Sequence, residues 1–573
     1  MIGNKYLAAG SYSASGEWAR VIPQIKNVAT VVNNQIAGNV ETEEATWDAG
    51  GADTLLHTKE NWAGDTTPNF SALPVEVTFS AGSRATADAK TIVGSIALDA
   101  PGDFTLDASG DGAIRLSGGI TAADDKATAH EYLVTAPLVL DAGQSWAFGT
   151  NANVTLAGPV STPENTPITT EVSSYQTLRF VGTGETGYTG TWSFPNVRHP
   201  AESSSYYGTC ILASGLNPFG GEGAVVSIAG GLQNGKKLNS GALIYNGNQN
   251  ALVLSNATVA ATLSFPYSTG EDRYGVWLYA APSSTNVVSG AVTNARRIII
   301  GENAQLTFNG PVSIHANDMS TDQSLCFQFS YEGGTEATKT SVVRFNGCVT
   351  FPTGSKKESD MAQMSYATYC FNAPSNVVDR VGGDNYFTIA TGADYAFAEG
   401  RTAVLFRYNG PSYLKLNGHS QHIGSINSGH ANTEISSTEP ATLRVNQTND
   451  VVYAGTVSSN IVFVKEGAAQ LGLSKADALK GAVRVVEGTL APEAGALASS
   501  VQLVFEGGTL SLPEGETVVH RVDYLEDSEL KSLPKGTYSA GDGSKIGSYL
   551  TGSGTLRVKT SDVVSSGLLI FVR

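Results

Sequence analysis

The sequence has little charge. Of its 573 residues, only 15% are Asp, Glu, Lys or Arg, whereas soluble domains average about 25%. Disorder does not follow, because 41% of the residues are hydrophobic, and chains that stay unfolded in water have few apolar residues to bury. The 64 glycines do not recur at every third position, which excludes collagen. A glycine-rich chain that uses Thr, Ser and Val in place of charge favours a long all-β protein.

Positive charge and long hydrophobic runs are also scarce. The chain has 35 basic and 52 acidic residues, a net charge of −17. Nucleic acids and anionic membrane surfaces are bound through concentrated Lys and Arg, so neither is an expected partner. No stretch reaches the roughly 18 apolar residues of a membrane span. The start of the chain, MIGNKYLAAG, lacks the cationic and apolar segments of a secretory signal.

Helical periodicity is nearly absent after the first forty residues. Short β-branched and aromatic runs alternate there with Gly, Asn, Asp and Ser, as in VEVTFSAG (75–82) and AVRVVEGTLAP (482–492). Such runs predict strands of about four to seven residues with turns between them. One pattern recurs: an apolar residue, a spacer, Gly, a second spacer, and then Val or Ile. It is found at Leu116–Ile120, Leu156–Val160, Phe308–Val312, Phe345–Val349 and Tyr453–Val457.

A period of about 20 residues emerges near the C-terminus. Glu-Gly pairs at 466–467, 487–488 and 506–507 are separated by 21 and 19 residues, and Thr489 and Thr509 by 20. A repeat of this length with glycine corners fits one coil of a parallel β-solenoid. Neighbouring coils pair their backbones at about 4.8 Å, and glycine permits tight corners. Because an antiparallel sandwich or barrel has no reason to keep such a period, we predict an all-β, right-handed parallel β-helix or β-solenoid.

The four cysteines give a second indication of the period. Cys326, Cys348 and Cys370 are separated by 22 and 22 residues, and Cys210 lies upstream. Equal spacing predicts equivalent positions on successive coils, as a stack of small buried side chains. A disulfide between neighbouring coils is an alternative, since stacked Cα atoms lie near 5 Å. A zinc site is disfavoured because no Cys-x-x-Cys pair is present, and loop insertions could make the equal spacing accidental.

Several segments resemble a known family. LKLNGHSQHIGSI (414–426), IVFVKEGAAQLGLS (461–474) and VRVVEGTLAP (483–492) resemble the autotransporter-associated β-strand repeat. WDAGGADTLLHTKENWAGDTTP (47–68) is similar to the tryptophan-bearing N-terminal module of large secreted repeat proteins of Verrucomicrobia-like bacteria, and LPKGTYSA (533–540) to their C-terminal end. The resemblance implies a right-handed β-solenoid in an extracellular or cell-surface setting. It implies no catalytic residues, because the motif is structural.

The first 45 residues match nothing in that family and have a pattern of their own. Four apolar residues there are spaced for one face of a helix: Val21, Ile25, Val28 and Val32. Such a helix would begin near Ile22, since Pro23 is tolerated only in a first turn. It would cap the first coil or serve as an oligomerisation or attachment element; simple β structure is the other alternative. We therefore expect an N-terminal extension over 1–45, a β-solenoid with loop insertions over 46–410, and C-terminal repeats with a cap over 411–573.

Candidate metal ligands are few. The segment Asp107-x-Ser109-x-Asp111-Gly112 matches the first half of a calcium loop, but its twelfth position is Gly118, which supplies no carboxylate. A turn between strands is the favoured interpretation. Three histidines could suggest metal ligation, but they lie in or near a turn that the repeat already explains: His419, His422 and His430. We predict no metal and no cofactor.

Catalytic motifs are missing as well. Four carboxylates fall in apparent loops: Asp124, Asp125, Asp318 and Asp322. A glycoside hydrolase would need two acids facing one groove at about 5–10 Å, and the sequence does not place these four on one face. There is no G-x-S-x-G elbow, phosphate loop or H-E-x-x-H helix. We therefore expect that the protein is not an enzyme.

Tyrosine and tryptophan gather among small polar residues in several loops. Flat aromatic faces suit sugar rings and protein interfaces, so these residues are the candidate contacts for a glycan or partner: Tyr206, Tyr207, Tyr267, Tyr274, Trp277 and Tyr279. The alternative is that they cover the flank of the solenoid or stack inside it.

Together these features predict a non-enzymatic structural or adhesive protein at the cell surface or outside the cell. It would be a secreted β-solenoid stalk or fibre that binds copies of itself, as a filament or trimer, or a surface glycan. One alternative is a phage tail-fibre or spike protein on the virion surface, which would bind a host glycan and would need no secretion signal. The other is a β-helix polysaccharide lyase or glycoside hydrolase.

Overall fold

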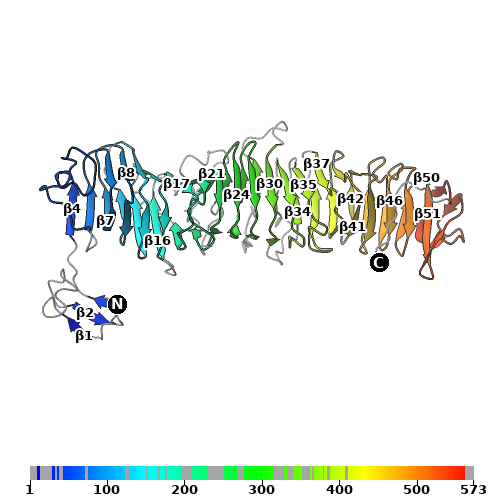
Figure 1. The fold of residues 1–573 in the computed structure, drawn as a ribbon. Helices are drawn as coiled ribbons and strands as arrows, with labels where there is room; N and C mark the ends of the chain where they lie inside the picture. The colour runs from blue at the N-terminus through cyan, green and yellow to red at the C-terminus, as the bar shows by residue number, and fades with distance from the viewer. Residues whose placement is uncertain are drawn as a thin grey trace, which may run out of the picture. The chain divides into compact units, whose positions relative to one another are not determined.

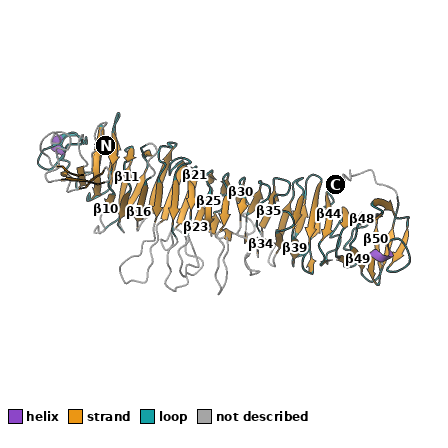
Figure 2. Cartoon of the chain, turned by 90° about the horizontal axis from the view of Figure 1, so that it is seen from below, coloured by secondary structure: helices purple, strands orange, loops and turns teal. Residues whose placement is uncertain are grey.

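The computed structural model describes residues 10–12, 29–32, 35–37, 43–70, 75–122, 128–149, 152–163, 168–174, 177–194, 210–229, 251–266, 277–295, 297–314, 328–331, 340–350, 362–363, 367–378, 380–383, 387–406 and 411–561. Two compact units, Met1–Leu178 and Arg179–Arg573, divide the chain within β17 (Thr177–Thr183). Within the described residues the structure consists of strands and the turns between them, and the short helices are the 3-10 turns η2 (Lys59–Asn61) and η5 (Gly547–Tyr549). Figure 2 shows the predominance of strands.

The N-terminal extension contains strands where the sequence predicted a helix. β1 (Gly10–Tyr12), β2 (Ala29–Val32) and β3 (Gln35–Ala37) form an antiparallel sheet in the order β1-β2-β3. Val32 lies in β2, so the predicted helical face is wrong at that residue. The run of β-branched residues that ends there loses side-chain freedom in a helix and fits an extended strand. Val21, Ile25 and Val28 lie outside the described residues.

The first unit is a parallel β-solenoid whose coils present three faces. The strands of each face pair in parallel, as Ile120 with Ile96 and Leu138 with Ile114 illustrate. The first face contains β4 (Glu43–Trp47), β5 (Val75–Phe79), the second half of β7 (Lys90–Leu98), β10 (Ile120–Ala122), β13 (Gln144–Phe148) and β16 (Thr169–Ser174). The second contains the first half of β7, β9 (Ala113–Leu116), β12 (Leu138–Leu140) and β15 (Val160–Ser161). The third contains β6 (Arg84–Ala87), β8 (Phe104–Ala108), β11 (His130–Val134) and β14 (Ala152–Leu156).

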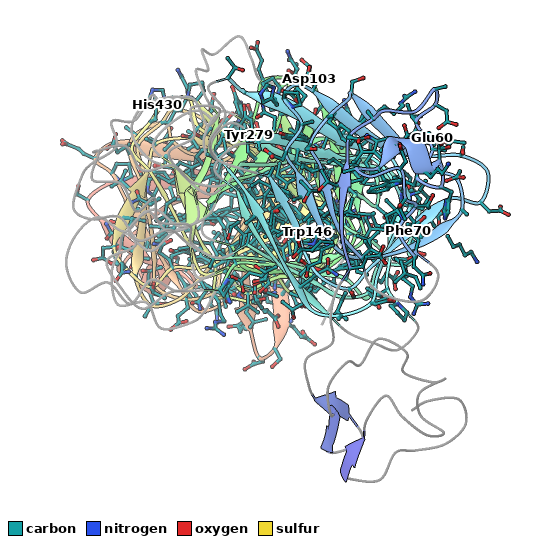
Figure 3. The ribbon with its side chains drawn as sticks, turned by 90° about the vertical axis from the view of Figure 1, so that its left-hand side faces the viewer. Glu60, Phe70, Asp103, Trp146, Tyr279 and His430 are labelled. Atoms are coloured by element: carbon teal, nitrogen blue, oxygen red, sulfur yellow. The ribbon has the colours of Figure 1, made fainter. Side chains whose placement is uncertain are left out.

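Large aromatic side chains fill the interior of this unit. Trp146, labelled in Figure 3, is fully buried, and its indole Nε1 donates to Gln144 Oε1 at 2.7 Å. Trp47 and Trp62 are also buried and meet edge to face at 5.2 Å. These two tryptophans belong to the segment that resembles a tryptophan-bearing N-terminal module. They pack as core residues and offer no exposed ring.

The second unit is also a parallel β-solenoid with three faces, named A, B and C here (Figure 1). Face A contains the first half of β21 (Ala251–Val259), which pairs with β19 (Cys210–Leu216), then β23 (Trp277–Ala280), β26 (Arg297–Ile300), β29 (Gln328–Tyr331), β32 (Ala362–Gln363), β34 (Arg380–Gly383), β36 (Ala403–Phe406), β39 (Ser425–Ser428), β42 (Val451–Tyr453), β45 (Gln470–Leu473), β47 (Thr489–Pro492), β49 (Thr509–Leu512) and β54 (Leu550–Gly552). Face B contains the second half of β21, then β24 (Thr285–Val288), β27 (Gln305–Phe308), β30 (Val342–Phe345), β33 (Thr368–Phe371), β35 (Phe387–Thr391), β37 (Ser412–Lys415), β40 (Glu434–Ser436) and β43 (Thr456–Val457). Face C contains β18 (Thr191–Phe194), β20 (Val225–Ile228), β22 (Thr262–Ser264), β25 (Val292–Ala295), β28 (Val312–Ile314), β31 (Val349–Thr350), β38 (Gln421–Ile423), β41 (Ala441–Asn446), β44 (Ile461–Glu466), β46 (Ala482–Val485), β48 (Gln502–Phe505) and β51 (Arg521–Glu526).

Inward side chains of the second unit stack directly from coil to coil. Phe308, Phe345 and Phe371 occupy one register position on β27, β30 and β33. Their rings stack with centroids 5.5 and 5.1 Å apart, and all three are at most 1% exposed. The spacing matches the distance between neighbouring coils, so each ring packs against the one above and the one below.

The recurrent glycine pattern marks the corners between faces. Gly310 and Gly347 join face B to face C, and a Cβ on Gly347 would lie 2.2 Å from the carbonyl oxygen of Gly310. A Cβ on Gly310 would likewise lie 2.3 Å from the oxygen of Gly290. Only glycine lets these backbones approach so closely. In the first unit Leu116–Ile120 joins the second face to the first, so the pattern marks tight corners in general and not one fixed corner of the coil.

The predicted 20-residue coil is confirmed in the C-terminal half of the second unit. Thr489 and Thr509, which are 20 residues apart, are paired in adjacent strands, and their hydroxyls lie 3.0 Å apart. On face C, Phe463 pairs with Val483 and Val483 with Leu503, at the same interval along the chain. The period read from the sequence is therefore the length of one coil in this region.

A buried lysine holds one of the corners in these regular coils. Lys465 is fully buried at the end of β44. Its ammonium donates to the carbonyl oxygens of Glu466, Gly467 and Glu487, at 2.8, 2.7 and 3.0 Å. Burial lowers the pKa of Lys465 to about 8, against the opposing effect of the acidic side chains nearby. The lysine thus supplies donors at this corner: Glu466 O also accepts from the Gln447 amide at 2.9 Å, and the ammonium adds bonds to Gly467 O and Glu487 O in the turns of two successive coils.

Antiparallel strands close the C-terminal end of the second unit. β52 (Glu529–Ser532) pairs with β51 antiparallel, and β53 (Gly536–Ser539) pairs antiparallel with β55 (Thr555–Val558), which also pairs with β50 (Glu516–Val519). β52 carries exposed charged residues, among them Glu529, 72% exposed in its side chain. A short, charged, antiparallel edge strand discourages pairing with a further chain.

Candidate binding surface

The aromatic residues predicted as partner contacts do not form a surface in the described structure. Tyr206, Tyr207, Tyr267 and Tyr274 lie outside the described residues, as does the side chain of Trp277 in β23. Tyr279, labelled in Figure 3, is only 2% exposed and packs with Val253, Ala281 and Ile299. A side chain so covered does not reach a glycan, so the prediction is wrong for Tyr279. The burial of Tyr279 agrees with the alternative interpretation, in which these aromatic residues cover a flank of the solenoid.

The predicted cysteine stack is wrong for Cys348 and Cys370. Cys370 in β33 is paired with Arg344 and Ala390, whereas Cys348 lies in the corner after β30. Equivalent positions on these two coils, such as Asn346 and Asn372, are 26 residues apart, so a spacing of 22 shifts the register by four. Both thiols are free; Cys348 is exposed, and burial raises the pKa of Cys370, partly offset by the Arg344 charge. Cys326, and the side chain of Cys210, lie outside the described residues.

The calcium-like segment forms a strand and a turn, as favoured. Asp107 lies in β8, where its Oδ1 accepts hydrogen bonds from the Thr135 hydroxyl at 2.7 Å and from the Ala108 amide at 2.8 Å. The bond from Thr135 is the main reason why the pKa of Asp107 is lowered. Among the described residues no three His, Cys, Asp or Glu side chains gather so that they could hold a metal ion. The loop carboxylates Asp124, Asp125, Asp318 and Asp322 lie outside these residues.

The predicted histidines separate into different surroundings. His422 on face C lies 3.0 Å from Glu466 Oε2 and 3.4 Å from Glu399 Oε1. Glu466 also pairs with Arg444, and the same arrangement recurs between Arg484 and Glu506. Each of these arginines therefore binds an acid of the following coil, so the charges of face C are largely compensated within the surface. His430 lies in a turn, where its Nδ1 accepts from the Asn432 amide.

A different set of side chains lies along one corner of the second unit, and we call this set the corner strip. It follows the corner between faces B and C over five successive coils. Its members are Asn309, Asn346, Asn372, Asp394, Tyr395 and His419. Its amides share one register position, whereas Asp394, Tyr395 and His419 lie two or three residues further along the corner on the next two coils.

The amide ladder is the first part of the corner strip. Asn309, Asn346 and Asn372 directly follow the stacked phenylalanines, so they share one register position. Asn346 Nδ2 donates to Asn309 Oδ1 at 2.8 Å, and Asn372 Nδ2 donates to Asn346 Oδ1 at 2.8 Å. An amide can make four hydrogen bonds, and these bonds use only two of the four at Asn346. The next coil has Gly392 at this position, where a Cβ would lie 2.3 Å from Asn372 Oδ1. The ladder therefore ends at Asn372, because glycine has no side chain to continue it.

Tyr395 is the aromatic member of the strip. It follows Gly392 in the corner after β35, and its side chain is among the few large apolar groups exposed in the described structure, at 45%. Its φ is +51°, a left-handed conformation that bulky residues rarely adopt. The backbone is fixed on both sides, because Ser375 N donates to Tyr395 O at 2.7 Å and Tyr395 N donates to Ser420 O at 2.8 Å. Neighbouring coils thus hold an exposed ring in a strained conformation.

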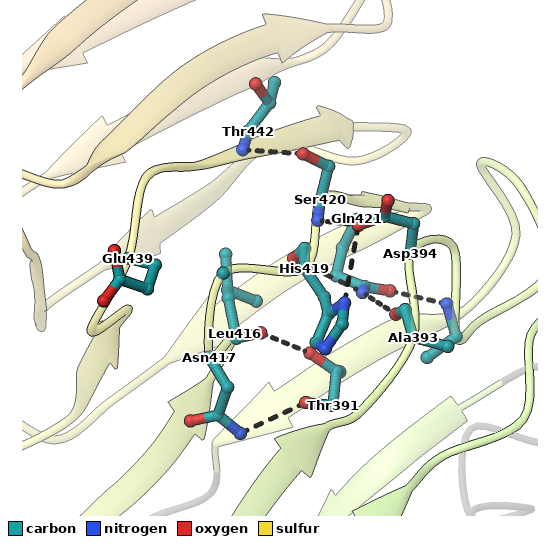
Figure 4. Close-up of polar contacts among 12 residues, drawn as sticks. Thr391, Ala393, Asp394, Leu416, Asn417, His419, Ser420, Gln421, Glu439 and Thr442 are labelled. Atoms are coloured by element: carbon teal, nitrogen blue, oxygen red, sulfur yellow. Dashed lines mark hydrogen bonds and ion pairs between the residues drawn. The ribbon is translucent and has the colours of Figure 1, made fainter. Parts of the chain in front are cut away.

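Asp394 directly precedes Tyr395 in the chain and lies beside His419 (Figure 4). Asp394 Oδ1 accepts from the Ser420 amide at 2.7 Å and lies 3.7 Å from His419 Nδ1. The carboxylate is 63% exposed and the imidazole 37% exposed. An aromatic ring, a carboxylate, an imidazole and aligned amides thus face solvent along one corner. Such groups recognise hydroxyl-rich ligands through stacking and hydrogen bonds.

The sequence held a partial signal for this surface. The pattern around Phe308–Val312 and Phe345–Val349 puts Asn before each corner glycine, so two ladder amides were visible as FNGPV and FNGCV. Tyr395 was not visible, because its alignment with the ladder depends on coil lengths that are not constant. Asn309 and Asn346 are 37 residues apart, Asn346 and Asn372 are 26 residues apart, and the next coil is shorter again.

Comparisons with known proteins found no family model, no curated protein and no solved structure that matches the chain. The resemblance to the autotransporter-associated repeat therefore stays a prediction. Within the described ranges, no helix is both long enough and apolar enough to cross a bilayer.

Proposed function

We propose that the protein is a non-enzymatic structural and adhesive element of a cell surface, whose solenoid carries a binding corner. The observation that supports the proposal best is the parallel ladder of faces A and B across the second unit, closed at its C-terminal end by antiparallel strands. Successive hydrogen-bonded coils with stacked cores make a stiff scaffold, because each coil is held by both of its neighbours. The suggested family resemblance agrees with this role and with an extracellular location.

The charged residues give support to a non-enzymatic role. Glu466 and Glu506 on face C are engaged by arginines, and Asp394 accepts a backbone hydrogen bond. Acids held in this way act as structural partners. A β-helix hydrolase would need an unpaired acid kept protonated beside a second carboxylate.

The C-terminal cap determines whether this end of the solenoid can pair with another copy of the chain. Solenoid ends polymerise when strand edges remain open. The antiparallel β52 and β53 place charged, differently oriented strands at this end. We therefore favour a stalk of finite length over a head-to-tail filament.

Two measurements on the full chain test the proposal. Antibodies against the chain, used for immunogold labelling of intact source cells, are expected to mark the cell surface, and labelling confined to the cell interior would contradict the proposal. Incubation with neutral and uronate polysaccharides is expected to release no reducing ends and no unsaturated products. Turnover of any of them would establish an enzyme instead.

A further inference from the structure

We propose that the corner strip binds one extended, neutral glycan chain that runs along the axis of the second solenoid unit, with Tyr395 as its stacking platform. The proposal rests on the adhesive role above and adds the ligand class and the site.

The spacing of the strip is the first argument. Equivalent positions on adjacent coils repeat at about the separation of neighbouring strands, roughly 4.8 Å. The stacked rings of Phe345 and Phe371, 5.1 Å apart, show this repeat directly beneath the strip. An extended glycan advances by a similar distance with each pyranose, so successive sugars would lie over successive coils, with neighbouring sugars of a β-1,4-linked chain presenting opposite edges to the strip.

The hydrogen-bonding capacity of the ladder is the second argument. Asn346 receives one amide bond from Asn372 and gives one to Asn309, which leaves one N–H and one lone pair on its exposed side chain. A sugar hydroxyl both donates and accepts, so it can satisfy both groups. An amide already fixed by its neighbours also loses little rotamer freedom when a ligand binds.

The aromatic ring is the third argument. Tyr395 is held at φ +51° by backbone hydrogen bonds to two adjacent coils, and its ring stays 45% exposed. Ser375 on the preceding coil has the same left-handed conformation, at φ +58°, so the turn belongs to the corner itself, and the feature to be explained is the large exposed side chain at this turn. The face of a pyranose ring would cover such a surface. Asp394, which precedes Tyr395 in the chain, and His419, 3.7 Å from the Asp394 carboxylate, offer polar groups for its hydroxyls.

The negative charge of the protein favours neutral over acidic glycans as ligands. The chain has a net charge of −17, and the strip includes the exposed carboxylate oxygens of Asp394. A polyuronate would place further carboxylates beside them, which raises the electrostatic cost of binding. A neutral glycan avoids this repulsion.

Isothermal titration of the full chain with three hexasaccharides tests the proposal. Cellohexaose is extended and neutral, hexagalacturonate is extended and acidic, and maltohexaose is neutral but coiled. We expect cellohexaose to bind in the micromolar to millimolar range and the other two to bind at least about tenfold more weakly, a difference of about 1.4 kcal/mol. Absence of binding by cellohexaose at millimolar concentration, or equal or tighter binding of hexagalacturonate or maltohexaose, would overturn the proposal.

Variants locate the site. Tyr395→Gly should keep the fold, since glycine adopts a positive φ without strain, and should weaken cellohexaose binding about tenfold. Tyr395→Phe should bind like the wild type, and Asn346→Ala should lose about threefold to tenfold. Tyr538→Ala in the C-terminal cap is the control and should change nothing. If Tyr395→Gly melts like the wild type and binds equally well, the site is wrong, whereas surface labelling of cells would still report separately on the proposed function.

Discussion

Two sets of coils in the second unit differ in length but not in their interior. In the coils of β27, β30 and β33, the ladder amides show the steps between equivalent positions: Asn309 to Asn346 is 37 residues, and Asn346 to Asn372 is 26 residues. In the coils of β44, β46 and β48 the register advances evenly, at the same interval as Thr489 and Thr509, which are 20 residues apart. β30 and β46 bury apolar side chains in the same alternating pattern, and in the regular set Val464 of β44 and Val504 of β48 are buried in addition. The inward register is therefore what keeps coils aligned, and additional residues are accommodated between strands.

The outer surfaces of the two sets differ in chemistry. The irregular coils have an amide ladder and lead to an exposed tyrosine, whereas the regular coils have arginines paired with glutamates of the next coil. In the regular coils these charged side chains pair with one another. In the irregular coils the ladder amides retain donors and acceptors that a ligand could bond. Four substitutions test how far this comparison holds.

Phe345→Ala should have the largest effect. The ring is fully buried between two others, so its loss should reduce the free energy of unfolding by about 3–5 kcal/mol. Hydrogen exchange followed by mass spectrometry should show protection lost chiefly in the adjacent coils, because a solenoid couples nearest neighbours. Phe463→Ala in the regular set is the matched variant and should cost a similar amount. A much smaller loss at Phe345 would show that the irregular coils are less tightly packed.

Gly347→Ala should be next in size. The new Cβ would lie 2.2 Å from the Gly310 carbonyl oxygen, and the overlap should cost about 1–3 kcal/mol in chemical denaturation. Gly488→Ala, whose Cβ would lie 2.3 Å from Gly467 O, also places a side chain at a φ of +68°, so it should cost at least as much if corners are equally tight in both sets. Gly102→Ala, with nothing within 4 Å, is the control and should change stability by less than about 0.5 kcal/mol. An equal loss in all three would refute crowding as the cause.

Lys465→Met should remove about 1–2 kcal/mol at pH 7, because Gly467 O and Glu487 O lose the ammonium as a donor, while Glu466 O keeps its bond from the Gln447 amide. The pH dependence gives the sharper test. The folded-state pKa is about 8, below the usual 10.5, so the unfolded chain holds a proton that the folded chain releases between these pH values. The stability of the wild type should therefore rise relative to that of Lys465→Met as pH increases through this window, and should not change relative to it below the window. Parallel pH profiles for the two proteins would contradict this account.

Arg484→Met should have the smallest effect. The guanidinium and Glu506 are 21% and 17% exposed, and a pair near the surface contributes about 1 kcal/mol or less. Salt should shrink the difference from the wild type, since ions screen the pair. Asn346→Ala in the irregular set should cost a similar amount that does not change with salt. Salt-insensitive loss at Arg484 would show that its stem, which lies beside Val464 and Val504, matters more than its charge.

The sequence allowed the architecture to be predicted because repetition leaves a regular trace. Thr489 and Thr509 lie 20 residues apart and stack as their spacing indicated. Prediction failed where spacing alone was used across an irregular coil, since the interval from Cys348 to Cys370 is shorter than the step from Asn346 to Asn372 that defines that coil. It also failed at Val32, where apolar spacing suited a helix but β-branched residues form a strand.

The binding surface was the least predictable part. Aromatic content pointed to Tyr279, which the structure buries, while Tyr395 stood in a segment without any marker. Exposure depends on which side of the strand a residue faces and on what covers it, and both depend on contacts between residues far apart in the chain. The Asn that precedes each corner glycine was visible, but only the structure shows that Tyr395 lies further along the same corner, opposite Ser375 of the preceding coil.

The amide ladder also gives this corner a direction. All of its bonds run the same way, from the Nδ2 of one coil to the Oδ1 of the coil before it. The order of donors and acceptors along this surface therefore differs when it is followed in the opposite direction. A linear chain has two distinguishable ends, so its two possible orientations on the strip would meet different patterns of donors and acceptors. The corner can therefore favour one polarity of a bound chain, and with it fix which end of that chain points toward the C-terminal cap.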